Sequence, residues 1–157
     1  MSEFTHLNEG FPSMVDVGEK SITKRTAVAR GSITLPKEVL SRLENQEIHV
    51  AKGPVFQTAI LAGTLAAKKT SDLIPLCHPL ALNRIQIKIS TAEDRAIAEA
   101  TVSCDGKTGV EMEALTAVSV ALLTIYDMCK SFSQDMRMGD IELIRKEGGK
   151  SDYQAHG

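Results

Sequence analysis

The chain has 157 residues, of which 43% are hydrophobic and 24% charged, values typical of a folded globular domain and not of a disordered segment. Its 18 Lys and Arg residues nearly balance 20 Asp and Glu residues, and the resulting net charge of -2 disfavours binding to nucleic acid through a basic surface. Three scattered cysteines, Cys77, Cys104 and Cys129, exclude a disulfide framework and a zinc knuckle, and they favour a reducing, cytoplasmic location.

The first half of the chain predicts an arm, a strand and two helices. Residues 1–13 are polar, contain Gly10 and Pro12, and are expected to form a loose arm. Residues 23–35 are rich in β-branched side chains, which favours a strand. Two helices follow, over residues 36–44 and 53–69, because each begins at a proline and continues with an apolar stripe.

The second half begins with a stiff segment, residues 73–80, in which two prolines disfavour a helix. Apolar residues alternate over 85–89, and together with residues 96–104 they predict a hairpin that turns at 93–94. Residues 110–132 predict a long helix that is apolar nearly all round, and residues 141–144 a last strand before a tail at 150–157. The longest uncharged apolar run, residues 114–126, is too short to span a bilayer, so no membrane association is predicted.

This order of elements indicates a single α+β domain over residues 1–157. If the two early helices act as one crossover, the order becomes βαββαβ. That order predicts a ferredoxin-like sandwich, a four-stranded and mostly antiparallel sheet with helices packed on one face. The other face of the sheet and the doubly apolar helix both need cover, which predicts a homo-oligomer.

Asp127 and Lys130 share one face near the end of the long helix because they lie three residues apart. They could form an ordinary surface salt bridge. The uncharged stretch before them, however, predicts poor solvation at Asp127. A carboxylate beside an ammonium group in a desolvated pocket is suited to proton transfer.

Further candidate residues lie around two chain segments. Glu111 and Glu113 fall in the first turn of the long helix, where acids are favoured by the helix dipole or could face a pocket. Cys77 and His78 are held between two prolines, which suits hydrogen bonding to a ligand or proton transfer. No third ligand lies at a recognisable spacing, so a metal site is not predicted.

Basic residues are numerous enough for a polyphosphate despite the acidic net charge. Lys52 directly precedes a helix start, where a lysine and the helix N-terminus together favour an anion. Lys146 and Lys150 flank a pair of glycines whose backbone N–H groups also suit phosphate. Arg25 and Lys68 add to this set of predicted phosphate ligands.

Three motifs resemble a known family. They are MVDV at residues 14–17, DLIPLCHPL at 72–80, and GKTGVEMEALTA at 106–117 followed by YDMCK at 126–130. Together they are similar to the MoaC family of molybdenum-cofactor biosynthesis, over residues 5–151. The family usually has an acidic residue after the pair that corresponds to Lys52 and Gly53, where this chain has Pro54.

The resemblance implies a lyase. The expected reaction converts a cyclised dihydroguanosine triphosphate (3',8-cyclo-7,8-dihydro-GTP) to cyclic pyranopterin monophosphate and releases pyrophosphate. It also implies a ferredoxin-like fold and a hexamer, a trimer of dimers, with active sites at a subunit interface. No cofactor is expected beyond a divalent metal that could accompany the triphosphate.

The resemblance also implies roles for individual residues. Asp127, Lys130 and Lys52 match the catalytic group. Substrate contacts match a second set of positions: Leu76, Cys77, His78, Glu111, Met112 and Glu113. The alternative function is a ferredoxin-like regulatory module that binds a nucleotide without turnover, and release of pyrophosphate would distinguish the two.

Overall fold

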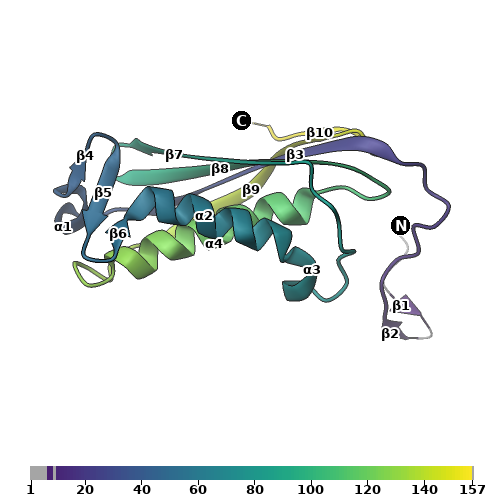
Figure 1. Ribbon diagram of the computed structural model, residues 1–157, viewed down its shortest axis with the longest axis horizontal. Coiled ribbons are helices and arrows are strands. Elements are labelled where there is room, and N and C mark those ends of the chain that lie inside the picture. Colours follow the sequence, from purple (N-terminus) through teal and green to yellow (C-terminus); the bar gives the residue numbers. More distant parts are fainter. Residues whose placement is uncertain (1–6, 9, 157) are drawn as a thin grey trace.

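The centre of the fold is one large antiparallel sheet with helices packed on one of its faces (Figure 1). The computed structural model describes residues 7–8 and 10–156. Its four long strands are β3 (Thr23–Thr34), β7 (Arg84–Ala92), β8 (Arg95–Gly106) and β9 (Met138–Glu147). They lie in the order β9-β3-β8-β7, so the first and third strands are central, as in the predicted ferredoxin-like sandwich.

The sheet differs from the prediction by one strand. The predicted tail contains β10 (Tyr153–Gln154), which pairs with β9 and makes the sheet five-stranded. In the predicted N-terminal arm, β1 (Leu7–Asn8) pairs with β2 (Phe11–Pro12), while residues 1–6 and 9 of that arm lie outside the described residues.

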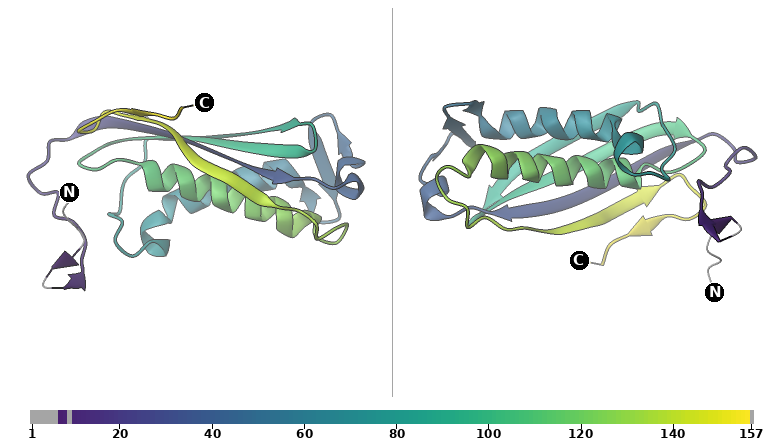
Figure 2. Two further views of the ribbon diagram at one scale, coloured as in Figure 1. Left: turned by 180° about the vertical axis from the view of Figure 1, so that it is seen from behind. Right: turned by 90° about the horizontal axis from the view of Figure 1, so that it is seen from below.

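Two long helices, α2 (Val55–Lys68) and α4 (Glu111–Cys129), run antiparallel beneath the sheet (Figure 2). Small residues allow their close approach, as the sequence indicates. A Cβ atom added at Gly63 of α2 would lie 2.8 Å from the carbonyl oxygen of Ala117 in α4 and 2.7 Å from Cδ1 of Ile87 in the sheet. Larger side chains at this crossing would therefore push α2 away from both neighbours.

The connection from β3 to α2 is where the prediction is wrong. The helix expected over residues 36–44 is only α1 (Lys37–Leu40). A small three-stranded sheet follows, made of β4 (Leu43–Glu44), β5 (Glu47–Val50) and β6 (Gly53–Pro54). Asn45 and Gln46 have positive φ angles of 51° and 62°, so they reverse the chain between β4 and β5 and a helix cannot continue.

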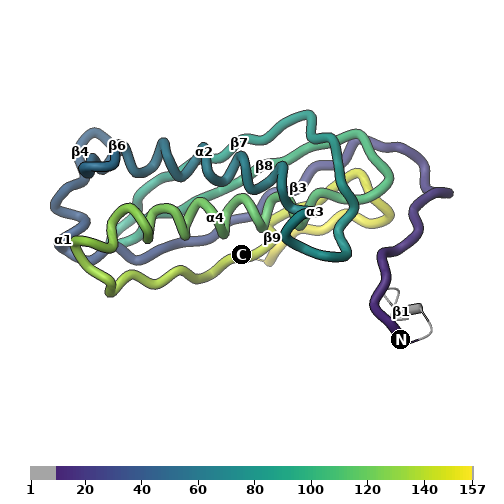
Figure 3. The backbone as a smooth tube through the Cα atoms, turned by 60° about the horizontal axis from the view of Figure 1, so that its bottom comes forward, coloured from purple at the N-terminus to yellow at the C-terminus, as the bar shows by residue number. Residues whose placement is uncertain are grey.

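The two ends of α4 have different neighbours (Figure 3). The start of α4 lies beside α3 (Thr70–Leu73), the short helix after α2, whereas its end lies beside β6 and the start of α2. Residues that follow α3 or precede α4 therefore gather at one end of the molecule. Residues of the β5–β6 turn gather at the other end, with the last turn of α4.

The outer face of the sheet is polar, which weakens one of the arguments for an oligomer. Arg30 and Glu99 lie opposite each other on β3 and β8 and form an ion pair at 3.3 Å, with Lys88 next to Glu99 on β7. An antiparallel sheet can expose such a face to water. The exposed leucines instead lie on the helices, at Leu61 and Leu65 of α2, Leu73 of α3 and Leu123 of α4.

The uncharged run at residues 114–126 belongs to a 19-residue helix, longer than the run itself. By length and composition α4 could cross a membrane, but half of its apolar stretch is buried inside the domain. The helix packs on the sheet and on α2, which is typical of the core helix of a globular domain.

Candidate functional site

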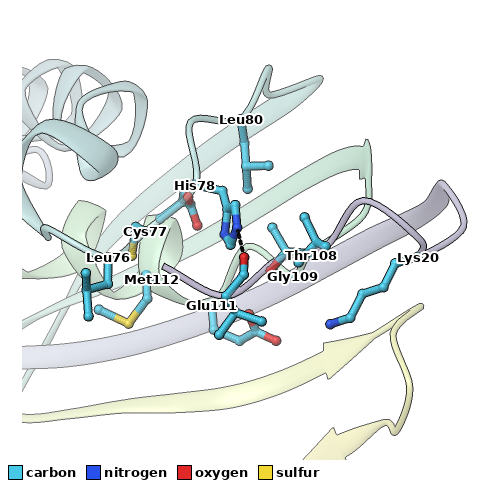
Figure 4. Close-up of a pocket in the computed structure, with 12 residues that line it drawn as sticks. Lys20, Leu76, Cys77, His78, Leu80, Thr108, Gly109, Glu111 and Met112 are labelled. Carbon is cyan, nitrogen blue, oxygen red and sulfur yellow. Dashed lines mark hydrogen bonds between the residues drawn. The ribbon is translucent and has the colours of Figure 1, made fainter. Parts of the chain in front are cut away.

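A cavity of about 350 Å³ opens at the start of α4 (Figure 4). Three segments that are distant in the sequence form its walls: the chain before β3, the proline-bounded segment after α3, and the turn that leads into α4. The lining residues are Val15, Val17, Lys20, Leu76, Cys77, His78, Leu80, Thr108, Gly109, Glu111, Met112 and Glu113. The cavity thus brings together all six residues that were predicted to contact substrate around Cys77 and Glu111.

Two hydrogen bonds hold the chain before β3 against this cavity. Nε2 of His78 lies 2.6 Å from the carbonyl oxygen of Val15, and because a carbonyl only accepts, Nε2 carries the proton (Figure 4). Nζ of Lys107 donates to the carbonyl oxygen of Gly18 at 3.0 Å. The proline-bounded segment therefore presents His78 in one orientation, with its Nε2–H group directed at Val15.

Glu113 is the buried acid of this cavity, with 4% of its surface exposed. Burial raises its pKa from the ordinary value of 4.5 to about 7, and the nearby charge of Glu111 adds to the increase. Near neutral pH the protonated and ionised forms of Glu113 are thus both populated, so it can donate and accept a proton. Burial, reinforced by Glu113, also raises the pKa of Cys77, which keeps that thiol protonated.

A second cavity of about 200 Å³ adjoins the first and is strongly basic. Lys20, Arg25, Lys146 and Lys150 line it, and the two cavities share Lys20 and Glu111. Glu111 and Glu147 also line it and balance part of this charge, and Nζ of Lys146 lies 3.4 Å from Oε1 of Glu111. The surplus of cations suits a ligand with several negative charges.

Asp127, Lys130 and Lys52, which the resemblance assigned to one catalytic group, lie together at the opposite end of α4. Nζ of Lys130 donates to Oδ1 of Asp127 at 2.6 Å, and Nζ of Lys52 lies 3.7 Å from Oδ2. The hydrogen bond and charge of Lys130, helped by Lys52, hold the pKa of Asp127 below its ordinary value, so Asp127 remains a carboxylate. An open depression of about 450 Å³, lined partly by Leu123 and Tyr126, lies beside them.

The expected desolvation of Asp127 is wrong for the single chain. The side chain is 53% exposed, and those of Lys130 and Lys52 are 50% and 63% exposed. Helix α4 is buried on one side up to its last turn, where Met128 and Cys129 are buried, but Asp127 lies on the opposite side with the exposed Leu123. From the helical rise of 1.5 Å per residue, Asp127 lies about 21 Å along the axis from Glu113.

The structure does not bring Lys68 to the other predicted site residues, and it adds three lining residues that were not predicted. Lys68, at the end of α2, is exposed and lines none of these three cavities. Val15, Val17 and Lys20 line the first cavity, although the sequence analysis gave them no role; the MVDV motif was the available signal. In the part of the chain that the structure describes, no three His, Cys, Asp or Glu side chains cluster so as to hold a metal ion.

Comparison with known proteins places this arrangement in a family. The model of the MoaC family matches residues 14–149. A protein from Roseiflexus sp. (strain RS-1) is 53% identical over 154 residues, which cover 96% of each chain. Proteins from Lysinibacillus sphaericus (strain C3-41) and Campylobacter jejuni subsp. jejuni (strain 81-176) are 48% and 49% identical over at least 95% of each chain. All three relatives are named cyclic pyranopterin monophosphate synthase. The family model and these relatives agree with the three motifs, and the chain belongs to the MoaC family.

Proposed function

We propose that the chain is a cyclic pyranopterin monophosphate synthase, a lyase of molybdenum-cofactor biosynthesis. It converts 3',8-cyclo-7,8-dihydro-GTP to cyclic pyranopterin monophosphate and pyrophosphate. The observation on which the proposal rests is a cavity with a titratable buried acid, Glu113, that shares lining residues with a basic cavity. Relatives about half identical over nearly the whole chain bear the name of this activity.

The first cavity suits the base and pterin chemistry. Opening a purine ring and closing a pterin ring needs several proton transfers and no change of oxidation state, so the proposal includes no redox cofactor. Glu113, with a pKa of about 7, is suited to give and take protons near neutral pH. Val15 holds Nε2 of His78, which leaves Nδ1 for a ligand.

The second cavity suits the triphosphate. Formation of the cyclic phosphate requires an internal hydroxyl to attack the α-phosphorus while the bond to pyrophosphate breaks. Arg25, Lys20, Lys146 and Lys150 would stabilise the negative charge that develops on the phosphates and on the leaving group. A divalent cation would enter with the triphosphate and not from a protein site.

We further propose that each active site is shared by two protomers of a homo-oligomer, a hexamer built as a trimer of dimers. A catalytic group must come within hydrogen-bond reach of the reacting atoms. The separation of about 21 Å along α4 keeps Asp127 of one chain from the cavity of the same chain. A two-fold axis near Val120, the midpoint between Glu113 and Asp127, would place the end of one α4 beside the start of its partner.

The surface of the helical layer supports this arrangement. Leu61, Leu65 and Leu123 are 66%, 60% and 54% exposed, on the side of α2 and α4 away from the sheet. Covering them with a second copy would bury apolar area and desolvate the Asp127 cluster. We place the enzyme in the cytoplasm, because it has free cysteines at Cys77, Cys104 and Cys129.

The activity is tested by a single-turnover assay with purified cyclised substrate. The proposal predicts pyrophosphate and cyclic pyranopterin monophosphate in equal amounts from the parent chain. Lys52→Ala, Asp127→Ala and Lys130→Ala variants that still assemble should form little product, whereas Glu142→Gln, on an exposed strand position, should match the parent. Substrate binding without pyrophosphate release would identify a regulatory module, and near-normal turnover in all three variants would refute their catalytic role.

A further inference from the structure

Glu47 is a buried carboxylate that lies outside both cavities. It begins β5, and only 8% of its surface is exposed. A charged group at such depth is costly unless it is fully hydrogen-bonded. The structure supplies three backbone donors: N–H groups of Ile48 at 2.8 Å and Phe56 at 2.8 Å to Oε1, and of Gln57 at 3.1 Å to Oε2.

Two of these donors belong to the first turn of α2. The helix begins at Val55 with Pro54 as its N-cap residue, and Pro54 makes no side-chain capping bond. A normal N-cap side chain would accept from the second and third helical residues, here Phe56 and Gln57. Glu47 accepts from these two residues, so it caps α2 from a neighbouring strand.

The cap lies next to Lys52. β5 pairs with β6 through His49 with Pro54 and Val50 with Gly53, which leaves Ala51 and Lys52 as a tight turn. Glu47 anchors this hairpin where β5 begins and also where β6 enters α2. The turn is therefore fixed from both sides, although Lys52 itself is 63% exposed and its side chain is otherwise free to move.

The carboxylate also lies near the last turn of α4. Burial raises the pKa of Cys129 to about 11, and the charge of Glu47 adds to that effect. Cys129 is fully buried and follows Asp127 by two residues. Glu47, on the strand that leads to Lys52, is thus close enough to the last turn of α4 for its charge to act on Cys129.

We propose that Glu47 is a positioning residue: by capping α2 in place of Pro54, it fixes the β5–β6 turn so that Lys52 reaches Asp127. This inference rests on the proposed function of Lys52. It predicts that the helix cap acts on the rate of the chemical step and not only on stability. A displacement of about 1 Å in a reacting group can cost about 100-fold in rate.

The experiment compares Glu47→Ala with a variant that moves the cap. Asp is a favourable N-cap residue, so Glu47→Ala/Pro54→Asp should satisfy the donors of Phe56 and Gln57 again from position 54. Val118→Ala, in the core of α4, serves as a control that loses stability without touching the β5–β6 turn. Lys52→Ala gives the reference for complete loss of the amine.

Two readouts are measured on the assembled enzyme: kcat and KM, and hydrogen exchange of the peptide that spans residues 47–60. Glu47→Ala should expose this peptide to exchange and lower kcat about 10- to 100-fold, with KM changed by less than about threefold. Adding Pro54→Asp should restore both the protection and kcat. If Glu47→Ala does not assemble, Glu47→Gln gives the same comparison with a smaller loss, because the amide keeps an acceptor oxygen.

The inference is overturned if Glu47→Ala has the kcat of Val118→Ala, or if Pro54→Asp restores protection but not kcat. Full activity of Lys52→Ala would refute the proposed catalytic role of Lys52 and this inference with it. An inactive Lys52→Ala beside an unaffected Glu47→Ala would overturn the positioning role alone.

Discussion

Replacing Glu113 by Gln should change how stability depends on pH. In the folded protein Glu113 has a pKa of about 7, whereas its ordinary value is 4.5. Between these two pH values the folded state holds a proton that the unfolded chain releases. The stability of the protein should therefore fall as pH rises through this window, because the unfolded state binds fewer protons there.

The size of the effect follows from the two pKa values. Each pKa unit corresponds to 1.36 kcal/mol, so ionisation of Glu113 should cost about 3 kcal/mol of folding free energy once the pH exceeds 7. Only 4% of the surface of Glu113 is exposed, but the cavity that it lines is open to solvent, which screens part of the penalty, so about 3 kcal/mol is its upper limit. The Gln side chain carries no charge at any pH and avoids this cost.

Urea unfolding between about pH 4.5 and pH 8, at fixed protein concentration, measures the difference between parent and variant. The free energy of unfolding of Glu113→Gln relative to the parent should rise across this range, by up to about 3 kcal/mol. Glu99→Gln, which removes an exposed carboxylate paired with Arg30, should give a difference that stays nearly constant. A flat profile for Glu113→Gln would refute the assignment of a raised pKa to this acid.

Three further outcomes are expected. Gly63→Ala should destabilise the fold by about 1–3 kcal/mol in urea unfolding, because its Cβ meets the backbone of α4, whereas Gly139→Ala meets nothing within 4 Å and should cost much less. In a carbon-13 NMR titration, the pKa of Asp127 should rise toward its ordinary value in Lys130→Ala, since Lys130 is the main cause of its depression; an unchanged pKa would contradict the observed ion pair. The rise should be smaller in Lys52→Ala, because that amine is 3.7 Å away, and a larger rise than in Lys130→Ala would contradict the geometry.

Much of the fold follows from local sequence patterns. The alternation of Ile85, Ile87 and Ile89 predicts β7, and the turn at Glu93 is confirmed by its positive φ angle of 56°. The small sheet of β4, β5 and β6 could not be predicted, because its strands are two to four residues long and carry no period. A stripe at Val39, Leu40 and Leu43 imitates a helix there, although the helix ends at Leu40.

For the candidate site too, some residues could be identified from the sequence and others could not. The motifs around His78 and Glu111 identify much of the lining of the first cavity, because the residues within each motif stay together in space. The exposure of Asp127 was missed because α4 is apolar on both sides but buried on only one in the single chain, and Asp127 lies on the exposed side with Leu123. Glu47 was missed because the donors that it caps lie up to ten residues away.

The central claim, that one active site uses the cavity of one protomer and the Asp127 cluster of another, is tested by subunit mixing. Glu113→Ala and Lys130→Ala should each be inactive alone. Dissociated, mixed in equal amounts and reassembled, they should regain about one quarter of parent activity, because half of the dimers are mixed and each has one intact site. Activity no higher than that of the separate variants would contradict a shared site.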